Sequence, residues 1–147
     1  MFSVPKYGWV NISIGDWSDR ASYLTDPHLD MLDAFITLYK GRNPGAVFCD
    51  AEGWDFIIVI SFNDVFVIEQ KDEPKLYNFD ALDIRIRALC EEVIEDIEGH
   101  LYEWSLWDFN VEDEATRVKS EEKIKSKLSE LREALEDYDN RHRSRRI

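Results

Sequence analysis

The sequence predicts a single α+β domain, in which an antiparallel sheet of about four strands in the order β-α-β-β-β is followed by two long helices. Two observations predict this class. Residues 7–69 contain four short segments rich in apolar, β-branched and aromatic residues, with one helical pattern after the first of them. From Asp80 onward the apolar residues instead recur every three or four positions, which is typical of amphipathic helices. The length of 147 residues fits one domain.

The first predicted strand and helix occupy residues 7–41. Residues 7–14 alternate between apolar and polar side chains, and a polar link follows at 18–22. A helix is expected to begin at Asp26-Pro27, because Asp can cap a helix and Pro fits its first position, and to end at Gly41. Its expected buried face consists of Leu32, Phe35, Ile36 and Tyr39.

Three further strands are predicted at residues 46–51, 54–62 and 65–69. The middle segment is mostly apolar and is expected to be a central strand covered on at least one face. Glu52-Gly53 is a candidate turn, and Asn63-Asp64 is a candidate two-residue hairpin loop because both residues tolerate positive φ. Asp72-Glu73-Pro74 is expected to end this group of strands.

Two helices are predicted in the C-terminal half. The apolar face of the first consists of Leu82, Ile86, Leu89, Val93, Ile97, Leu101 and Trp104, with a kink or break near Gly99-His100. Residues 104–109 are expected to form an aromatic packed corner. The last helix opens at residues 112–114, and its heptad seam consists of Ile124, Leu128, Leu131, Leu135 and Tyr138. This seam folds back on the domain, which would leave a monomer, or forms a homodimer, or the helix is a frayed tail.

The charge is unevenly distributed along the chain. The formal net charge is −13, and residues 1–111 carry 8 basic and 21 acidic side chains, whereas residues 112–147 carry 10 of each. The domain therefore consists of an acidic α+β body at 1–111 and a C-terminal amphipathic helix at 112–147 that ends in a basic tail.

This charge bears on the class of partner. Nucleic acid and anionic membranes attract Lys and Arg clusters, so we expect this chain to bind neither. An acidic body favours encounter with a basic protein, although solubility alone also explains such a charge. Cys49 and Cys90 lie among apolar residues and are interpreted as buried free thiols. The start of the chain shows no signal-peptide pattern, and together these features predict a cytoplasmic protein.

Candidate functional residues are few. Asp50, Glu52 and Asp55 surround the predicted turn, where they can be solvated acids, bind a partner or a divalent cation, or act as acid and base. No nucleophile motif, phosphate loop or zinc spacing is present, so no catalytic residue, metal site or cofactor is predicted. The histidines, His28, His100 and His142, are expected to be structural.

A second acidic group is predicted on the first long helix. Glu91, Glu95 and Glu98 lie about one turn apart on one face, which is either a solvated surface or a binding face for a basic partner. Among the tryptophans, Trp9 and Trp104 are expected in the core. Trp17, beside the expected strand end at Asp16, is the candidate exposed binding anchor.

Two segments carry a resemblance. The run Tyr7-Gly8-Trp9-Val10-Asn11-Ile12-Ser13-Ile14-Gly15-Asp16-Trp17 and the later Ala51-Glu52-Gly53-Trp54, in a small acidic α+β chain, resemble the small immunity proteins of bacterial toxin systems. They also resemble uncharacterised bacterial single-domain proteins of this size. The resemblance covers about the first 70 residues. It implies that the protein binds a toxin domain and blocks its active site.

Three functions therefore remain open from the sequence. The first is a binding or inhibitor module of the immunity type, directed at a basic protein such as a nuclease. The second is an enzyme that uses the group around Asp50 with a divalent metal. The third is a structural or assembly protein that dimerises through its last helix.

Overall fold

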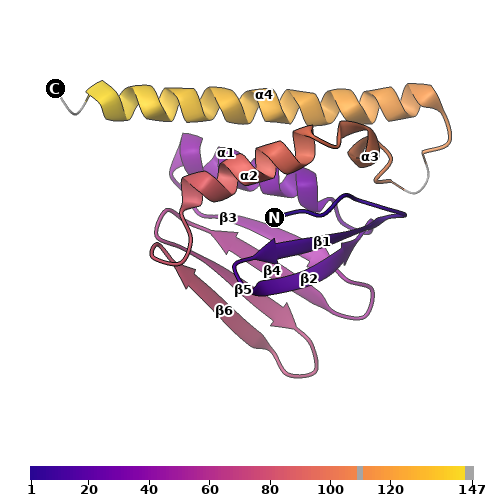
Figure 1. The fold of residues 1–147 in the computed structure, drawn as a ribbon, viewed down its shortest axis with the longest axis horizontal. Helices are drawn as coiled ribbons and strands as arrows, with labels where there is room; N and C mark the ends of the chain where they lie inside the picture. Colours follow the sequence, from indigo (N-terminus) through magenta and orange to yellow (C-terminus); the bar gives the residue numbers. More distant parts are fainter. Residues whose placement is uncertain (109–110, 145–147) are drawn as a thin grey trace.

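The computed structural model describes residues 1–108 and 111–144 and confirms the α+β class (Figure 1). A hairpin of β1 (Trp9–Ile14) and β2 (Trp17–Ser22) precedes helix α1 (Pro27–Gly41). Strands β3 (Gly45–Asp50), β4 (Asp55–Ile60), β5 (Asp64–Gln70) and β6 (Lys75–Asp80) follow. The chain then forms α2 (Ile86–Glu98), α3 (Leu101–Ser105) and α4 (Glu114–Ser144).

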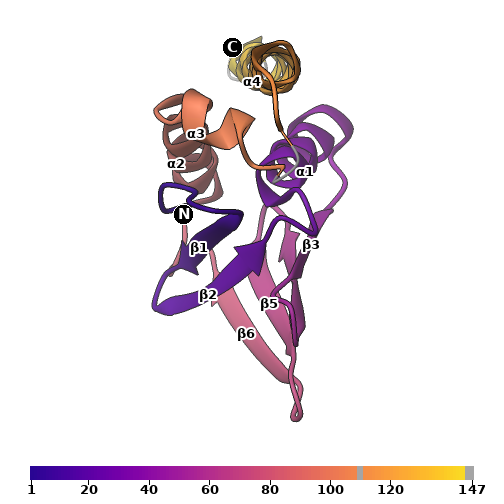
Figure 2. The same ribbon diagram turned by 90° about the vertical axis from the view of Figure 1, so that its right-hand side faces the viewer.

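The strands form two separate antiparallel sheets. Strands β3 to β6 pair in sequence order, whereas β1 pairs with β2 in its own hairpin. A four-stranded antiparallel sheet is therefore present as predicted, but its last strand is β6, and the first predicted strand lies outside it. The hairpin lies on one side of the larger sheet, and Figure 2 shows it between that sheet and α2.

Two strands were not predicted from the sequence, β2 and β6. Residues 18–22, expected as a link, belong to β2, and β6 follows the Pro74 that was expected to end the strands. Strand β2 is polar at four of its six positions and β6 at three of six, so neither segment shows a strong apolar strand pattern. Strand β2 forms because β1 supplies a complete antiparallel partner, and β6 forms in the same way on β5.

The core lies between α1, the hairpin and one face of the larger sheet. The inward side chains of the sheet are fully buried and consist of Val47, Cys49, Phe56, Ile58, Ile60, Val65 and Val67. All four predicted core residues of α1 are buried, and α1 starts at Pro27 as predicted, although the Asp26 side chain makes no capping hydrogen bond. At Gly45 the sheet approaches α1 so closely that a Cβ would lie 2.6 Å from the Ala34 backbone.

The first long helix is shorter than predicted and is broken where the sequence suggested. Helix α2 begins at Ile86, because the Asp80 carboxylate accepts the backbone N–H groups of Leu82 and Asp83 and forms a turn there. Leu82, predicted on the buried face, is 96% exposed. The chain leaves α2 at Gly99-His100 and continues as the short helix α3.

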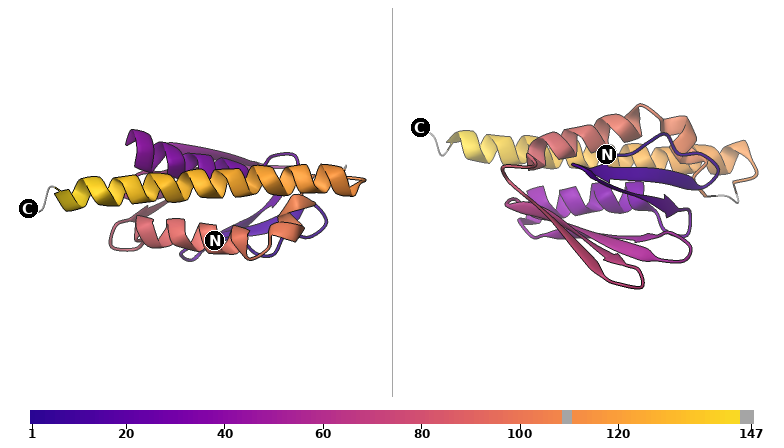
Figure 3. Two further views of the ribbon diagram at one scale, coloured as in Figure 1. Left: turned by 90° about the horizontal axis from the view of Figure 1, so that it is seen from above. Right: turned by 60° about the horizontal axis from the view of Figure 1, so that its bottom comes forward.

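Helix α4 folds back over the rest of the domain. It lies along α1 on one side and α2 with α3 on the other (Figure 3). Ile124, Leu128, Leu131 and Leu135 are buried in this layer, and the Tyr138 ring stacks on Phe62 at 5.5 Å. Of the predicted arrangements, the structure has the fold-back one. The helix continues to Ser144, and Phe109 of the predicted corner and residues 145–147 of the basic tail lie outside the described part.

The N-terminus is attached to α2. The Met1 ammonium group forms ion pairs with Glu92 and Asp96, and the Asp96 carboxylate also accepts the Phe2 N–H at 3.0 Å. Phe2 packs edge-on against Trp104. Among the described helices, none is both long enough and apolar enough to cross a membrane.

Candidate interaction surface

The outward face of the β3–β6 sheet, which we call the open face, carries apolar side chains. Antiparallel register aligns them in two neighbouring rows across the strands. One row consists of Phe48, Ile57, Ile68 and Leu76, and the next consists of Ala46, Val59, Phe66 and Asn78. Seven of these eight positions are apolar, so the face has the composition of a packing surface.

Nothing in the described part of the chain packs over these rows. Helix α1 and the hairpin lie on the opposite side of the sheet, and Figure 2 shows no helix on the outward side. Phe48 and Leu76 are 46% and 66% exposed, and Ile57, Val59, Phe66 and Ile68 are partly exposed. Contiguous exposed apolar patches in soluble proteins commonly mark interaction sites.

Aspartates border the apolar rows on both sides. Asp50 and Asp55 face each other across β3 and β4 at one end, and Asp64 and Asp80 face each other across β5 and β6 at the other. No outward position of these four strands, all of which the structure describes, is Lys, Arg or His. The open face is therefore apolar in the centre and negative at two opposite edges.

The predicted acidic group is only partly brought together. Asp50 and Asp55 are cross-strand neighbours, and Asp50 Oδ1 accepts the backbone N–H of Glu52 at 2.7 Å in the predicted turn. Glu52 adopts φ 55° there, and its side chain is exposed. Asp55 Oδ1 is buried and has no hydrogen-bond donor within the described chain. Among the described residues, no three His, Cys, Asp or Glu side chains are placed to hold a metal ion.

The prediction that Trp17 is an exposed anchor is wrong. Trp17 is 4% exposed, and its ring packs edge-on against Phe56 in the core. Its indole N–H donates to the buried Glu69 carboxylate at 2.7 Å, and Lys71 pairs with the same carboxylate at 2.8 Å. Burial opposes ionisation, but these partners hold the pKa of Glu69 below its usual value. Trp17 is inward because residues 17–22 form a strand rather than a loop.

A cation–π ladder fastens the hairpin to the larger sheet. The Arg20 guanidinium lies between the Trp9 and Trp54 rings, 5.1 and 5.0 Å from their centroids. Lys71 lies 5.1 Å from the Trp54 centroid, and the Trp54 indole N–H donates to Asp19 at 3.0 Å. Sequence reasoning missed this group because its members come from four segments that only the fold brings together.

The second predicted acidic group lies away from the open face, on α2. Its charges are more compensated than the sequence suggested, because Glu91 pairs with Arg87 at 3.2 Å and Glu98 pairs with Arg132 of α4 at 2.6 Å. Glu95 is exposed. Since α2 packs on the far side of the hairpin, the structure does not combine these acids with Asp50 and Asp55 in one site (Figure 2).

The buried nucleophilic and titratable groups are structural. Cys49 and Cys90 are free and buried as predicted, and burial raises the pKa of the Cys90 thiol to about 12. His28 is 2% exposed and stacks on Trp104 at 4.3 Å, and burial lowers its pKa to about 3. Because they are buried, these two thiols and this imidazole are not positioned to react with a substrate.

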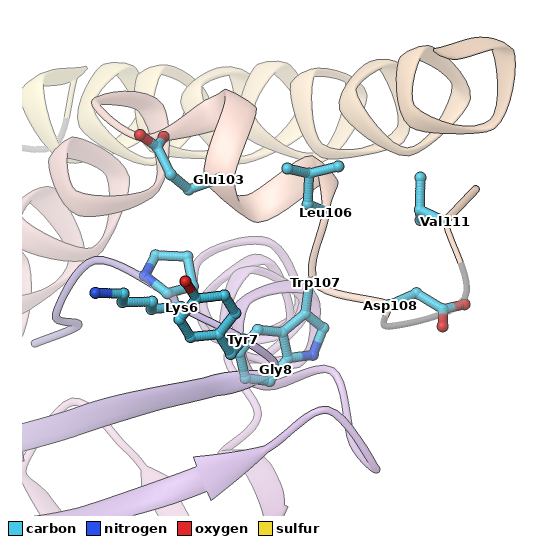
Figure 4. Close-up of a pocket in the computed structure, with 9 residues that line it drawn as sticks. Lys6, Tyr7, Gly8, Glu103, Leu106, Trp107, Asp108 and Val111 are labelled. Carbon is cyan, nitrogen blue, oxygen red and sulfur yellow. The ribbon is translucent and has the colours of Figure 1, made fainter. Parts of the chain in front are cut away.

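A cleft of about 360 Å³ lies between the N-terminal turn and the segment around α3 (Figure 4). Tyr7 and Gly8 form the two-residue turn on one wall, and Tyr7 has φ 53° with a ring that is 78% exposed. Leu106 and Trp107 contribute to the other wall. Its lining mixes apolar and charged side chains without a continuous apolar row, so the cleft is a weaker candidate for an interaction surface than the open face.

No protein-family model, no curated protein sequence and no solved structure matches this chain.

Proposed function

We propose that this protein is a protein-binding module of the inhibitor type, and that it binds a basic partner protein through the open face. The observation that carries the proposal is the pair of apolar rows on the outward side of β3–β6. The acidic body adds support, because a negative surface accelerates encounter with a positive one.

The energetics favour a partner on this face. Most of the Leu76 side chain is in water. Full burial of a leucine contributes roughly 1.5–3 kcal/mol, so a partner that covers Leu76 would gain much of this free energy. Phe48, Ile57 and Phe66 lie beside it in register and offer further apolar area. A partner that covers both rows gains this free energy without any rearrangement of the core.

An inhibitor role follows from the same chemistry. Nucleases and other enzymes that act on phosphates have basic active sites, and an acidic surface can occupy such a site. The immunity-type function implied by the sequence resemblance requires this kind of surface. Its aspartates are held on a rigid sheet, which reduces the conformational entropy lost on binding.

Photo-crosslinking in the cells from which the gene comes tests this proposal. A benzoylphenylalanine placed at Phe66, on the open face, is expected to form a defined adduct with a different protein. The same group at Tyr102, which is 58% exposed on α3, is the matched control. Leu76→Ser is expected to reduce the Phe66 adduct without unfolding the protein. Equal adducts at both positions, or an adduct that Leu76→Ser leaves unchanged, would contradict the proposal.

A further inference from the structure

We infer that the partner presents an apolar centre flanked on two opposite sides by Lys or Arg side chains, and that a second copy of this chain does not occupy the open face. This inference rests on the proposed function and specifies the chemistry of the partner. It follows from the positions of the four aspartates relative to the apolar rows.

The register sets the dimensions of the surface. Outward rows are two residues apart along a strand, or about 6.8 Å, so the Asp55 row and the Asp64 row, three steps apart, are separated by about 20 Å. Across four strands the apolar band extends about 14 Å. An element about 10–12 Å wide, such as an α-helix, fits between the aspartate rows, and its Lys or Arg side chains can reach both.

The aspartates at these edges need positive groups. Asp50 and Asp55 lie on adjacent strands with the same charge, and Asp55 Oδ1 is buried without a donor within the described chain. Like charges directly opposite each other on a sheet are destabilising, and a partner's ammonium or guanidinium group beside this pair would relieve the repulsion. Asp64 and Asp80 accept hydrogen bonds from Ser61 and from backbone N–H groups, which leaves their charges uncompensated.

Symmetry argues against a second copy. A face-to-face homodimer has its twofold axis in the plane of the interface. An axis along the strands places each aspartate row against the same row of the partner copy. An axis across the strands places the Asp50 and Asp55 row against the Asp64 and Asp80 row. In both arrangements acids face acids, and an oblique axis that crosses the two sheets still gives the aspartates no positive partner, because these strands have no outward Lys or Arg.

Three synthetic amphipathic peptides of about 14 residues provide the probe. They share one apolar stripe and carry Lys, Gln or Glu on both flanks. Fluorescence anisotropy at low salt measures their binding to the full chain. The Lys-flanked peptide is expected to bind more tightly than the Gln-flanked one, and the Glu-flanked one is expected not to bind.

Single substitutions at the edges identify the charges responsible. Asp55→Asn and Asp80→Asn are each expected to lower the affinity for the Lys-flanked peptide about two- to five-fold and to leave the affinity for the Gln-flanked peptide unchanged. Glu95→Gln on α2 removes the same charge away from the open face and is the matched control, with no expected effect. Leu76→Ser is expected to lower the affinity for both peptides.

The outcomes separate this inference from the proposed function. Equal binding of the Lys- and Gln-flanked peptides, with Leu76→Ser weakening both, refutes the charge inference and leaves the face as a binding site. Binding that Leu76→Ser does not change refutes the proposed function. Failure of the Lys-flanked peptide to bind overturns the inference. A wild-type dimer in sedimentation that Leu76→Asp converts to a monomer would also overturn it, since the occupant would then be a second copy.

Discussion

Lowering the pH from 7 to 5 is predicted to destabilise the protein by about 2 kcal/mol through one side chain, His28. This imidazole lies in the first turn of α1, stacked on Trp104 and edge-on to Trp107. Burial lowers its pKa to about 3, and the Lys123 ammonium group contributes in the same direction. His28 is therefore neutral in the folded protein at both pH values.

The magnitude follows from proton linkage. In the unfolded chain the imidazole regains a pKa near 6.5, so unfolding takes up a proton below that pH. The contribution of the neutral His28 to the free energy of unfolding is fully present above pH 6.5 and is lost as the pH falls from 6.5 toward 3. Between pH 7 and 5 the loss is about 2 kcal/mol, at 1.36 kcal/mol per pH unit once the unfolded form is protonated. The folded pKa hardly affects this figure because it lies well below the range.

Urea unfolding followed by tryptophan fluorescence at pH 7 and pH 5 measures the effect. His28→Gln removes the titrating group and serves as the reference. Asp26 and Asp30, whose pKa values burial raises, are present in both proteins and cancel in the comparison. The wild type is expected to lose about 2 kcal/mol more than the variant between the two pH values. The same pH dependence in both proteins would refute the assignment of a buried neutral imidazole.

Three substitutions test the packing. Leu131→Ala is expected to lower the free energy of unfolding by about 2–5 kcal/mol, because Leu131 is fully buried on the inward side of α4, whereas Glu133→Ala on the exposed side of the same helix is expected to change it by less than about 0.5 kcal/mol. Equal effects in calorimetry would contradict the fold-back of α4. Tyr7→Asn is expected to raise it by about 1 kcal/mol, because Asn tolerates the positive φ of this turn better, and a lower melting temperature would count against this. Gly45→Ala is expected to lower it by about 1–3 kcal/mol through contact with Ala34, and unchanged stability would show that the two backbones are less closely packed.

The elements predicted correctly are those with a strong local pattern. Helix α1 has a Pro at its first position and a four-residue apolar face, and in β4 an uninterrupted run of β-forming residues follows Asp55. These signals do not depend on the rest of the fold. By contrast, β2 and β6 are specified by the strands they pair with, and the exposed Leu82 lies in a turn that the Asp80 carboxylate stabilises.

The candidate site was only partly accessible from the sequence. The acids at Asp50 and Asp55 were visible because they lie close together along the chain. The apolar rows were not, since a row such as Phe48–Ile57–Ile68 is set by the register between strands. The alternation of buried and partly exposed positions in β4 is the signal that separates its two faces, and it is hidden because both faces are apolar.

The central claim is that the open face is where the partner binds, and methyl NMR of the complex with the crosslinked partner tests it most directly. The methyl resonances of Ile57, Val59, Ile68 and Leu76 are expected to shift on binding. Those of Ile58 and Ile60, on the buried side of β4, are expected to change little. Shifts confined to α2 or α4, with the open-face methyl groups unchanged, would contradict the account.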